Sequence, residues 1–173
     1  MKALNLANYI ICEAIEKYPQ YPITHLKLQK ILYYIVATYF ANNTDACEFF
    51  TDNEKIEKWQ FGPVLPSVYN EFKTYGGRAI TMPSTEIEFS LVEDEDTDFI
   101  IKEFDKENFE GNNPSIISLA QNVISKLINK DAFELVEMTH QEPAWSNYES
   151  IIKSGGRGLT YSIEELRSAT KII

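Results

Sequence analysis

The sequence predicts a mainly α-helical protein: a compact single-domain bundle of about six helices with a small β-hairpin or an irregular acidic insertion. Apolar residues recur at helical spacing in several segments that end at proline or glycine. Strand-like alternation is confined to one short acidic stretch. A length of 173 residues is typical of one domain. We therefore treat residues 1–173 as a single domain, with an insertion at about 80–112.

The composition is that of a folded cytoplasmic protein, with 44% hydrophobic and 24% charged residues. The N-terminus lacks the features of a signal peptide, and no apolar run approaches the ~20 residues that span a bilayer. Cys12 and Cys47 are far apart and share no metal-ligand spacing, so we expect two reduced, buried thiols. The net charge of −10 argues against general nucleic-acid binding.

The first two helices are the most clearly marked. A helix over Leu4–Lys17 ends where two prolines follow. Thr24 is a suitable N-cap for a second helix from His25 to about Ala41, which is apolar around nearly its whole circumference and should be central. Four of its polar residues fall on one stripe: Lys27, Lys30, Tyr34 and Thr38. The two lysines need either water or an acidic partner.

The middle of the chain alternates between turns and short elements. Residues 54–58 fit a turn of helix or a strand equally well, and Gly62-Pro63 predicts a turn. A third helix is expected over Pro66–Tyr75, closed by Gly76-Gly77.

The acidic insertion follows. Alternating residues from Ile87 to Leu91 and again at Phe99–Ile101 predict two strands around an acidic turn at Glu93–Asp98. From Glu86 to Glu110 there are eleven acidic residues and two lysines, a net charge of −9. The segment is either a hairpin with an acidic tip or a flexible insertion.

The C-terminal third predicts further helices. An amphipathic helix is expected over Pro114–Lys130. A capping box at Asp131–Glu134 starts a fifth helix to about Thr139, and a short helix is expected over Trp145–Ile152. A second capping box at Ser162–Glu165 starts the last, to about Thr170.

The residues that could carry chemistry are few. His140 has Glu137 and Glu142 nearby, an arrangement that suits either a general-base pair or a helix cap. Cysteine and histidine are not clustered as zinc ligands, the acidic turn lacks the EF-hand pattern, and Gly155–Gly158 lacks the P-loop lysine. We therefore expect no cofactor, no metal and no catalytic residue.

Aromatic and turn residues gather from Trp59 to Gly77, beside the lysine-bearing helix. The simple interpretation is that they fill the core, together with Trp145. The alternative is a partner-binding face, since tryptophan and tyrosine anchor interfaces.

Several of these segments resemble one known family. The segments 26–34, 56–72 and Tyr75-Gly76, then 135–140 with Pro143 and Trp145, and finally 163–166 are similar to the Panacea antitoxin-domain family. That family includes SocA-type antitoxins and phage-associated proteins. The resemblance covers about residues 4–77 and 114–168, which leaves the acidic insertion outside it.

The resemblance implies a helical, non-catalytic domain without a cofactor, encoded in toxin–antitoxin operons that are often in prophages. Members neutralise a companion toxin by direct binding, and one branch delivers its toxin to a protease as an adaptor. The motif residues carried over are Lys27, Gln29, Lys30, Trp59, Gly62, Pro63, Tyr69, Phe72, Thr139, His140 and Trp145.

The resulting hypothesis is an antitoxin that binds a toxin encoded by a neighbouring gene. The alternatives are a proteolytic adaptor, a His140-dependent enzyme and a DNA-binding autoregulator. Candidate partner-binding residues are Lys27, Lys30, Tyr34, Trp59, His140 and Trp145. Candidate structural residues are Gly62, Pro63, Tyr69, Phe72 and Thr139.

Overall fold

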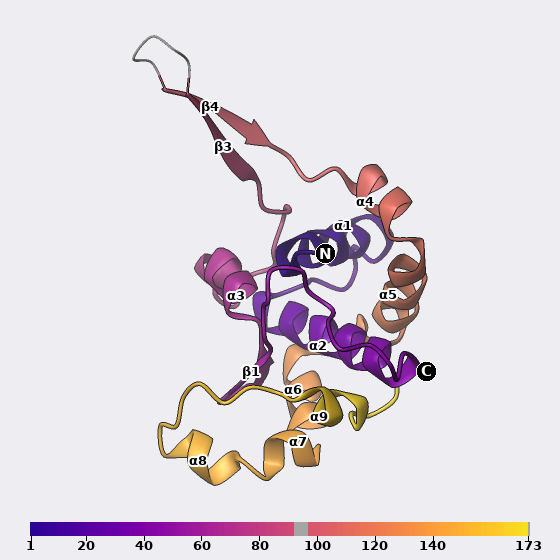
Figure 1. The fold of residues 1–173 in the computed structure, drawn as a ribbon, viewed down its shortest axis with the longest axis vertical. Coiled ribbons are helices and arrows are strands. Elements are labelled where there is room, and N and C mark those ends of the chain that lie inside the picture. Colours follow the sequence, from indigo (N-terminus) through magenta and orange to yellow (C-terminus); the bar gives the residue numbers. More distant parts are fainter. Residues whose placement is uncertain (92–96, 173) are drawn as a thin grey trace.

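Helix α2 (His25–Asn42) runs through the middle of the molecule, because apolar residues cover nearly its whole circumference (Figure 1). It begins at Thr24, whose side chain accepts a hydrogen bond from the Lys27 amide. The computed structural model describes residues 1–91 and 97–172.

The other helices surround α2. Those that pack directly on it are α1 (Ala3–Lys17), α3 (Pro66–Phe72), α5 (Pro114–Leu127), α6 (Ala132–His140) and α9 (Ile163–Arg167). Helix α4 (Lys106–Asn112) joins α1 to α5. The remaining pieces are short: a 3₁₀ turn η1 (Lys73–Tyr75), α7 (Pro143–Ser146) and α8 (Glu149–Lys153).

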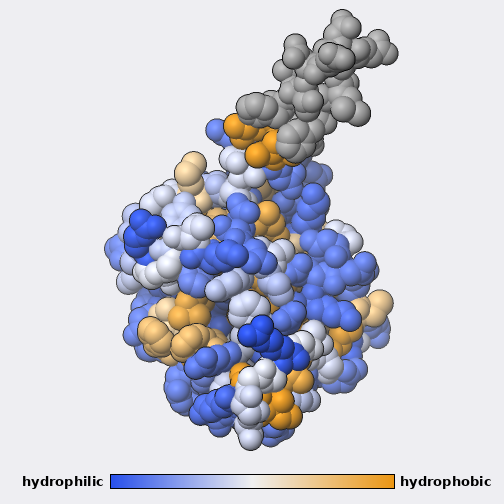
Figure 2. Space-filling view, turned by 90° about the vertical axis from the view of Figure 1, so that its left-hand side faces the viewer, coloured by the Kyte–Doolittle hydropathy of each residue, from blue (hydrophilic) through white to orange (hydrophobic). Residues whose placement is uncertain are grey.

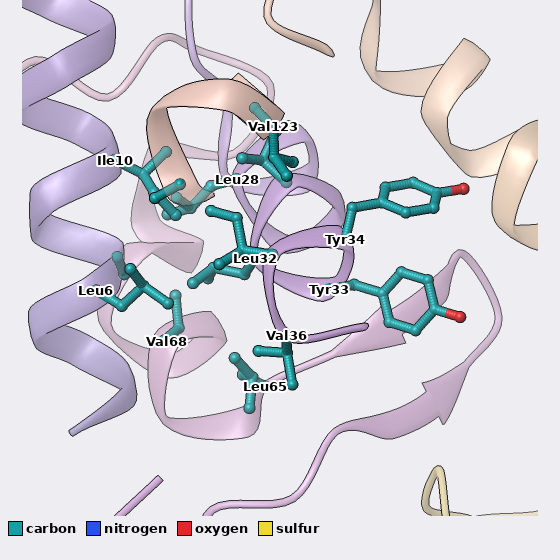
Figure 3. Close-up of a cluster of buried hydrophobic side chains, with 14 of the residues drawn as sticks. Leu6, Ile10, Leu28, Leu32, Tyr33, Tyr34, Val36, Leu65, Val68 and Val123 are labelled. Atoms are coloured by element: carbon teal, nitrogen blue, oxygen red, sulfur yellow. The ribbon is translucent and has the colours of Figure 1, made fainter. Parts of the chain in front are cut away.

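The hydrophobic core surrounds α2 and includes buried side chains of α1, α3, α5, α6 and α9. Figure 3 shows Leu28, Leu32 and Val36 of α2 meeting side chains from α1, α3 and α5. Tyr33 and Tyr34 extend from another side of α2, with their hydroxyls pointing away from this apolar cluster. Both tyrosines are nevertheless buried, which leaves two hydroxyls to be satisfied in the interior.

Two antiparallel hairpins complete the fold. Strands β1 (Glu57–Trp59) and β2 (Gly62–Val64) pair Trp59 with Gly62, and β2 packs against α2 and α6. Strands β3 (Glu86–Leu91) and β4 (Thr97–Lys102) pair Glu86 with Lys102 and project from the helical body (Figure 1). Figure 2 shows hydrophobic surface where this second hairpin leaves the body.

The mainly helical fold and both capping boxes are confirmed. The expected hairpin is also present, although residues 92–96 of its acidic turn lie outside the described residues. No helix in the described portion of the chain is both long and apolar enough to cross a membrane.

Other details differ from the expectations. The ambiguous segment at 54–58 ends in strand β1, and the hairpin turn lies at Gln60–Phe61, one step before Gly62-Pro63. The segment 145–152 contains the end of α7 and most of α8, and α4 was not predicted. The expectation of two buried thiols is wrong: Cys12, within α1, is half-buried, and Cys47 is exposed in the polar loop after α2.

Candidate functional site

The candidate site is a group of motif side chains that holds the β1–β2 hairpin against α2 and α6, which we call the hairpin-anchoring cluster (Lys30, Trp59, Gly62, Pro63, Thr139 and Trp145). At its centre, the fully buried Lys30 ammonium donates a hydrogen bond to the Pro63 carbonyl oxygen at 2.9 Å. Burial lowers the pKa of Lys30 from its usual 10.5 to about 7. The lysine therefore acts as a structural cross-link between α2 and β2.

The Gly62 backbone passes between the Lys30 side chain and α6. Its φ of +90° lies in a region that L side chains rarely adopt. A Cβ atom at this position would lie 2.5 Å from Thr139 Oγ1 and 3.1 Å from Lys30 Nζ. The Thr139 hydroxyl itself donates to the Val136 carbonyl oxygen at 2.8 Å. The close approach of β2 to α6 thus requires glycine on one side and a small hydroxyl residue on the other.

Trp145 holds the other strand of the hairpin. Its indole nitrogen donates to the Trp59 carbonyl oxygen at 2.9 Å, and its ring stacks on His140 with centroids 3.6 Å apart. Burial lowers the pKa of His140, and the nearby charge of Lys30 lowers it further. The imidazole is therefore mainly neutral near pH 7, which suits a stacked packing role.

Trp59 lies at the outer edge of the cluster, where it contacts Tyr69 of α3. The half-buried Trp59 ring meets Tyr69 edge to face at 4.9 Å, and its indole nitrogen donates to Glu57 at 2.7 Å. Tyr69 in turn contacts His25 at the start of α2, with centroids 5.7 Å apart. These contacts tie β1 to α3 and to the first turn of α2.

Lys27, which lies about one turn earlier in α2, has a comparable role. Its buried ammonium donates to the carbonyl oxygen of Ile128, at the C-terminal end of α5. Burial lowers the pKa of this lysine, while Asp131 and Glu134 act in the opposite direction. The helix end supplies the negative end of its dipole to the charge.

The two tyrosines of α2 face Glu142, an acidic residue that the sequence suggests only as a partner of His140. The Tyr33 hydroxyl donates to the Glu142 carboxylate, and the Thr170 amide donates to the other oxygen of Glu142 at 3.0 Å. Burial, and then the charge of Glu142, raise the pKa values of Tyr33 and Tyr34. Glu142 is itself buried, and it joins α2 to the last residues of the fold.

The structure places the candidate partner-binding residues mostly in the interior. Trp59 and His140 are half-buried, and the other four are buried: Lys27, Lys30, Tyr34 and Trp145. The two lysines of the polar α2 stripe donate to backbone carbonyl oxygens, partners that side-chain periodicity alone does not reveal. Among the candidate structural residues, Gly62, Pro63, Phe72 and Thr139 are buried, and Tyr69 is half-buried.

The His140–carboxylate pair considered from the sequence is not assembled. Glu142 binds Tyr33 and Thr170, and Glu137 accepts a hydrogen bond from Gln141 at 3.3 Å. Within residues 1–91 and 97–172, no three His, Cys, Asp or Glu side chains gather as a group that could hold a metal ion.

The same residues connect the chain to known proteins. A family model described as "Antitoxin SocA-like, Panacea domain" matches residues 28–146, more than half of the chain. The chain belongs to this family. All of the hairpin-anchoring cluster lies within the matched range, and Lys27 lies just before it. Comparisons with curated proteins and with solved structures gave no match.

The Panacea match confirms the resemblance seen in the sequence and gives the chain an antitoxin-type domain. The matched range also includes residues 80–112, which the sequence pattern indicates as an insertion. The structure further shows that most of the motif residues are buried and make contacts within the Panacea domain.

Proposed function

We propose that this Panacea domain is the antitoxin of a toxin–antitoxin pair, and that it neutralises a companion toxin by binding it directly, without chemistry of its own. The family match supports the antitoxin role in general terms. The partner and the mode of action are our proposal.

The observation that carries the proposal is the engagement of two motif lysines and of the neighbouring Glu142 in structural contacts. Lys27 and Lys30 bind backbone carbonyl oxygens, and Glu142 binds a buried tyrosine and a backbone amide. A catalytic acid or base must reach the proton that it transfers, within hydrogen-bonding distance of a substrate. These groups are already used, so they support a rigid scaffold that presents a fixed surface to another protein.

The charge distribution favours a basic companion. Residues 86–110 carry a net charge of −9, nearly the whole net charge of the chain. Toxins that act on RNA or nucleotides need basic clefts, and an acidic inhibitor associates faster with such a surface. The same charge opposes binding of the domain to DNA.

The test is expression of the neighbouring gene product alone and together with this chain. We expect the neighbour to arrest growth alone and the pair to grow, with the two proteins co-purifying as a complex. A neighbour that is harmless alone would contradict the antitoxin role.

Toxin abundance separates neutralisation from delivery to a protease. Direct neutralisation leaves the amount of toxin unchanged or raised, because the complex protects it. An adaptor lowers the amount of toxin, and its rescue disappears when the protease is deleted. A His140→Ala chain that retains both fold and rescue would argue against a His140-dependent enzyme.

A further inference from the structure

Two aromatic side chains stand out on the surface beside the hairpin-anchoring cluster. Phe61 lies in the turn of the β1–β2 hairpin and Phe133 in the first turn of α6; they are 49% and 66% exposed. Their rings meet edge to face, with centroids 6.4 Å apart and an angle of 84° between the planes. Single exposed apolar residues are common on proteins, but two phenylalanines in contact form a continuous aromatic surface.

The backbone that carries each member of this aromatic pair is held in place by hydrogen bonds. The carbonyl oxygens on either side of the Phe61 turn are fixed, that of Trp59 by Trp145 and that of Pro63 by Lys30. Phe133 follows the Asp131 N-cap, whose carboxylate accepts hydrogen bonds from the Phe133 and Glu134 amides at 2.7 and 2.8 Å. A surface that is already ordered loses little conformational entropy on binding.

Acidic groups lie next to the pair. Asp131 at the N-cap of α6 and Glu134 and Glu137 within α6 are exposed, and this helix with its N-cap contains no lysine or arginine, a net charge of −3. A second copy of the chain would bring like charge against like charge. A pocket that accepts two phenyl rings between lysine or arginine side chains is complementary in both shape and charge.

We propose that Phe61 and Phe133 are the anchor by which the chain binds its companion protein, and that the companion receives them in an apolar pocket bordered by basic side chains. This inference rests on the proposed function and specifies its contact surface. The buried motif then has a definite purpose: it fixes the hairpin turn that displays Phe61. Aromatic side chains on a rigid frame are typical of the few residues that dominate binding energy.

A competing surface lies on the projecting hairpin at the opposite end of the molecule (Figure 1). Ile87, Ile100 and Ile101 are each more than half exposed there. These isoleucines sit on a two-stranded hairpin that stands away from the body, whereas the phenylalanine pair is held by the contacts described above. They therefore supply the matched control for the experiment.

The experiment measures the affinity of the purified companion protein for Phe61→Ala, Phe133→Ala and the double variant. We expect each single substitution to weaken binding by about 30-fold, as for a residue at the centre of an interface. Ile87→Ala and Ile101→Ala should change the affinity by less than about threefold. Thermal unfolding of each free variant checks that the fold is kept; Phe133, the more exposed of the two, gives a result even if Phe61→Ala disturbs the turn.

Charge reversal provides an independent measurement. Glu137→Lys should slow association with the companion, most strongly at low salt, whereas Glu71→Lys on the exposed side of α3 should not. Binding of the double phenylalanine variant at wild-type strength would overturn the anchor and leave the antitoxin proposal intact. Loss of binding in the isoleucine variants alone would place the contact on the projecting hairpin. A wild-type chain that fails to bind its companion would overturn both proposals.

Discussion

The ammonium group of Lys30 and the carbonyl oxygen of Pro63 are 2.9 Å apart, and this hydrogen bond joins the central helix to the β1–β2 hairpin. A fully buried lysine is rare in proteins, because removing its charge from water is costly. Its presence here shows that the position of the hairpin is maintained at an energetic cost.

Because burial of the Lys30 charge is costly, we expect the free energy of unfolding to depend on pH. The folded chain releases the Lys30 proton above about pH 7, whereas the unfolded chain holds it to about pH 10. The unfolded state therefore binds more protons between these values, so the free energy of unfolding rises with pH in that window. The slope contributed by this group is at most about 1.4 kcal/mol per pH unit.

Urea unfolding at pH 7, 8 and 9 measures this slope, and Lys30→Met should flatten it. Lys27 has a pKa shifted in the same direction, but it remains in the variant, so the difference between the two proteins reports Lys30 alone. Equal slopes in wild type and variant would contradict the assignment.

Gly62→Ala should destabilise the fold strongly. The new methyl group would sit 2.5 Å from Thr139 Oγ1, at a φ of +90°. Strain and overpacking together predict a loss of about 3 kcal/mol in the free energy of unfolding. Gly77→Ala is the matched control, since a Cβ there meets no atom within 4 Å, and its effect should stay within about 0.5 kcal/mol. Similar stabilities for the two variants would show that the close approach at Gly62 is readily relaxed.

Trp145→Phe tests the hydrogen bond to the hairpin separately from the ring stack. Phenylalanine keeps an aromatic surface for His140 but removes the indole donor, leaving the Trp59 carbonyl oxygen without that partner. We expect a loss of about 1–3 kcal/mol in chemical denaturation. Trp59→Phe, which removes a more exposed bond to Glu57, should lose at most about 1 kcal/mol. A larger loss of stability for Trp59→Phe than for Trp145→Phe would mean that the indole hydrogen bond of Trp145 contributes little and that its packing dominates.

Tyr33→Phe should also destabilise the chain, by about 1.5–3 kcal/mol, because it removes a donor to the buried Glu142 carboxylate. Tyr39→Phe, on the half-buried side of the same helix, should remain within about 0.5 kcal/mol of wild type. Calorimetry of the two variants at one pH makes the comparison. A double variant with Glu142→Gln should lose less than the sum of the single changes, and strict additivity would indicate that the pair is not coupled.

The sequence was sufficient for the helical framework, because caps and periodicity act locally. Thr24, Asp131 and Ser162 each mark a helix start that the structure contains. The all-round apolar pattern of α2 correctly predicts its central position. The β1–β2 hairpin was harder to predict, since strands of three residues are too short to show alternation.

The site could be predicted only partially. The motif identifies the residues of the site, but the hydrogen-bond acceptor of a buried lysine is a group far away in the sequence. Lys30 binds a backbone carbonyl oxygen 33 positions later and Lys27 one 101 positions later, and a backbone acceptor has no sequence signature. Phe61 and Phe133 were missed because exposure of an aromatic residue follows from tertiary packing. A phenylalanine directly before Gly62-Pro63, in an expected turn, is the one local signal that could have drawn attention to it.

The stacked pair of Trp145 and His140 has a spectroscopic consequence. The chain contains two tryptophans, and both belong to the hairpin-anchoring cluster. The tryptophan fluorescence of this protein therefore reports on the position of one small hairpin. Acidification that protonates the imidazole beneath Trp145 should dim that emission before the helices melt, giving an optical readout of local loosening that circular dichroism does not see.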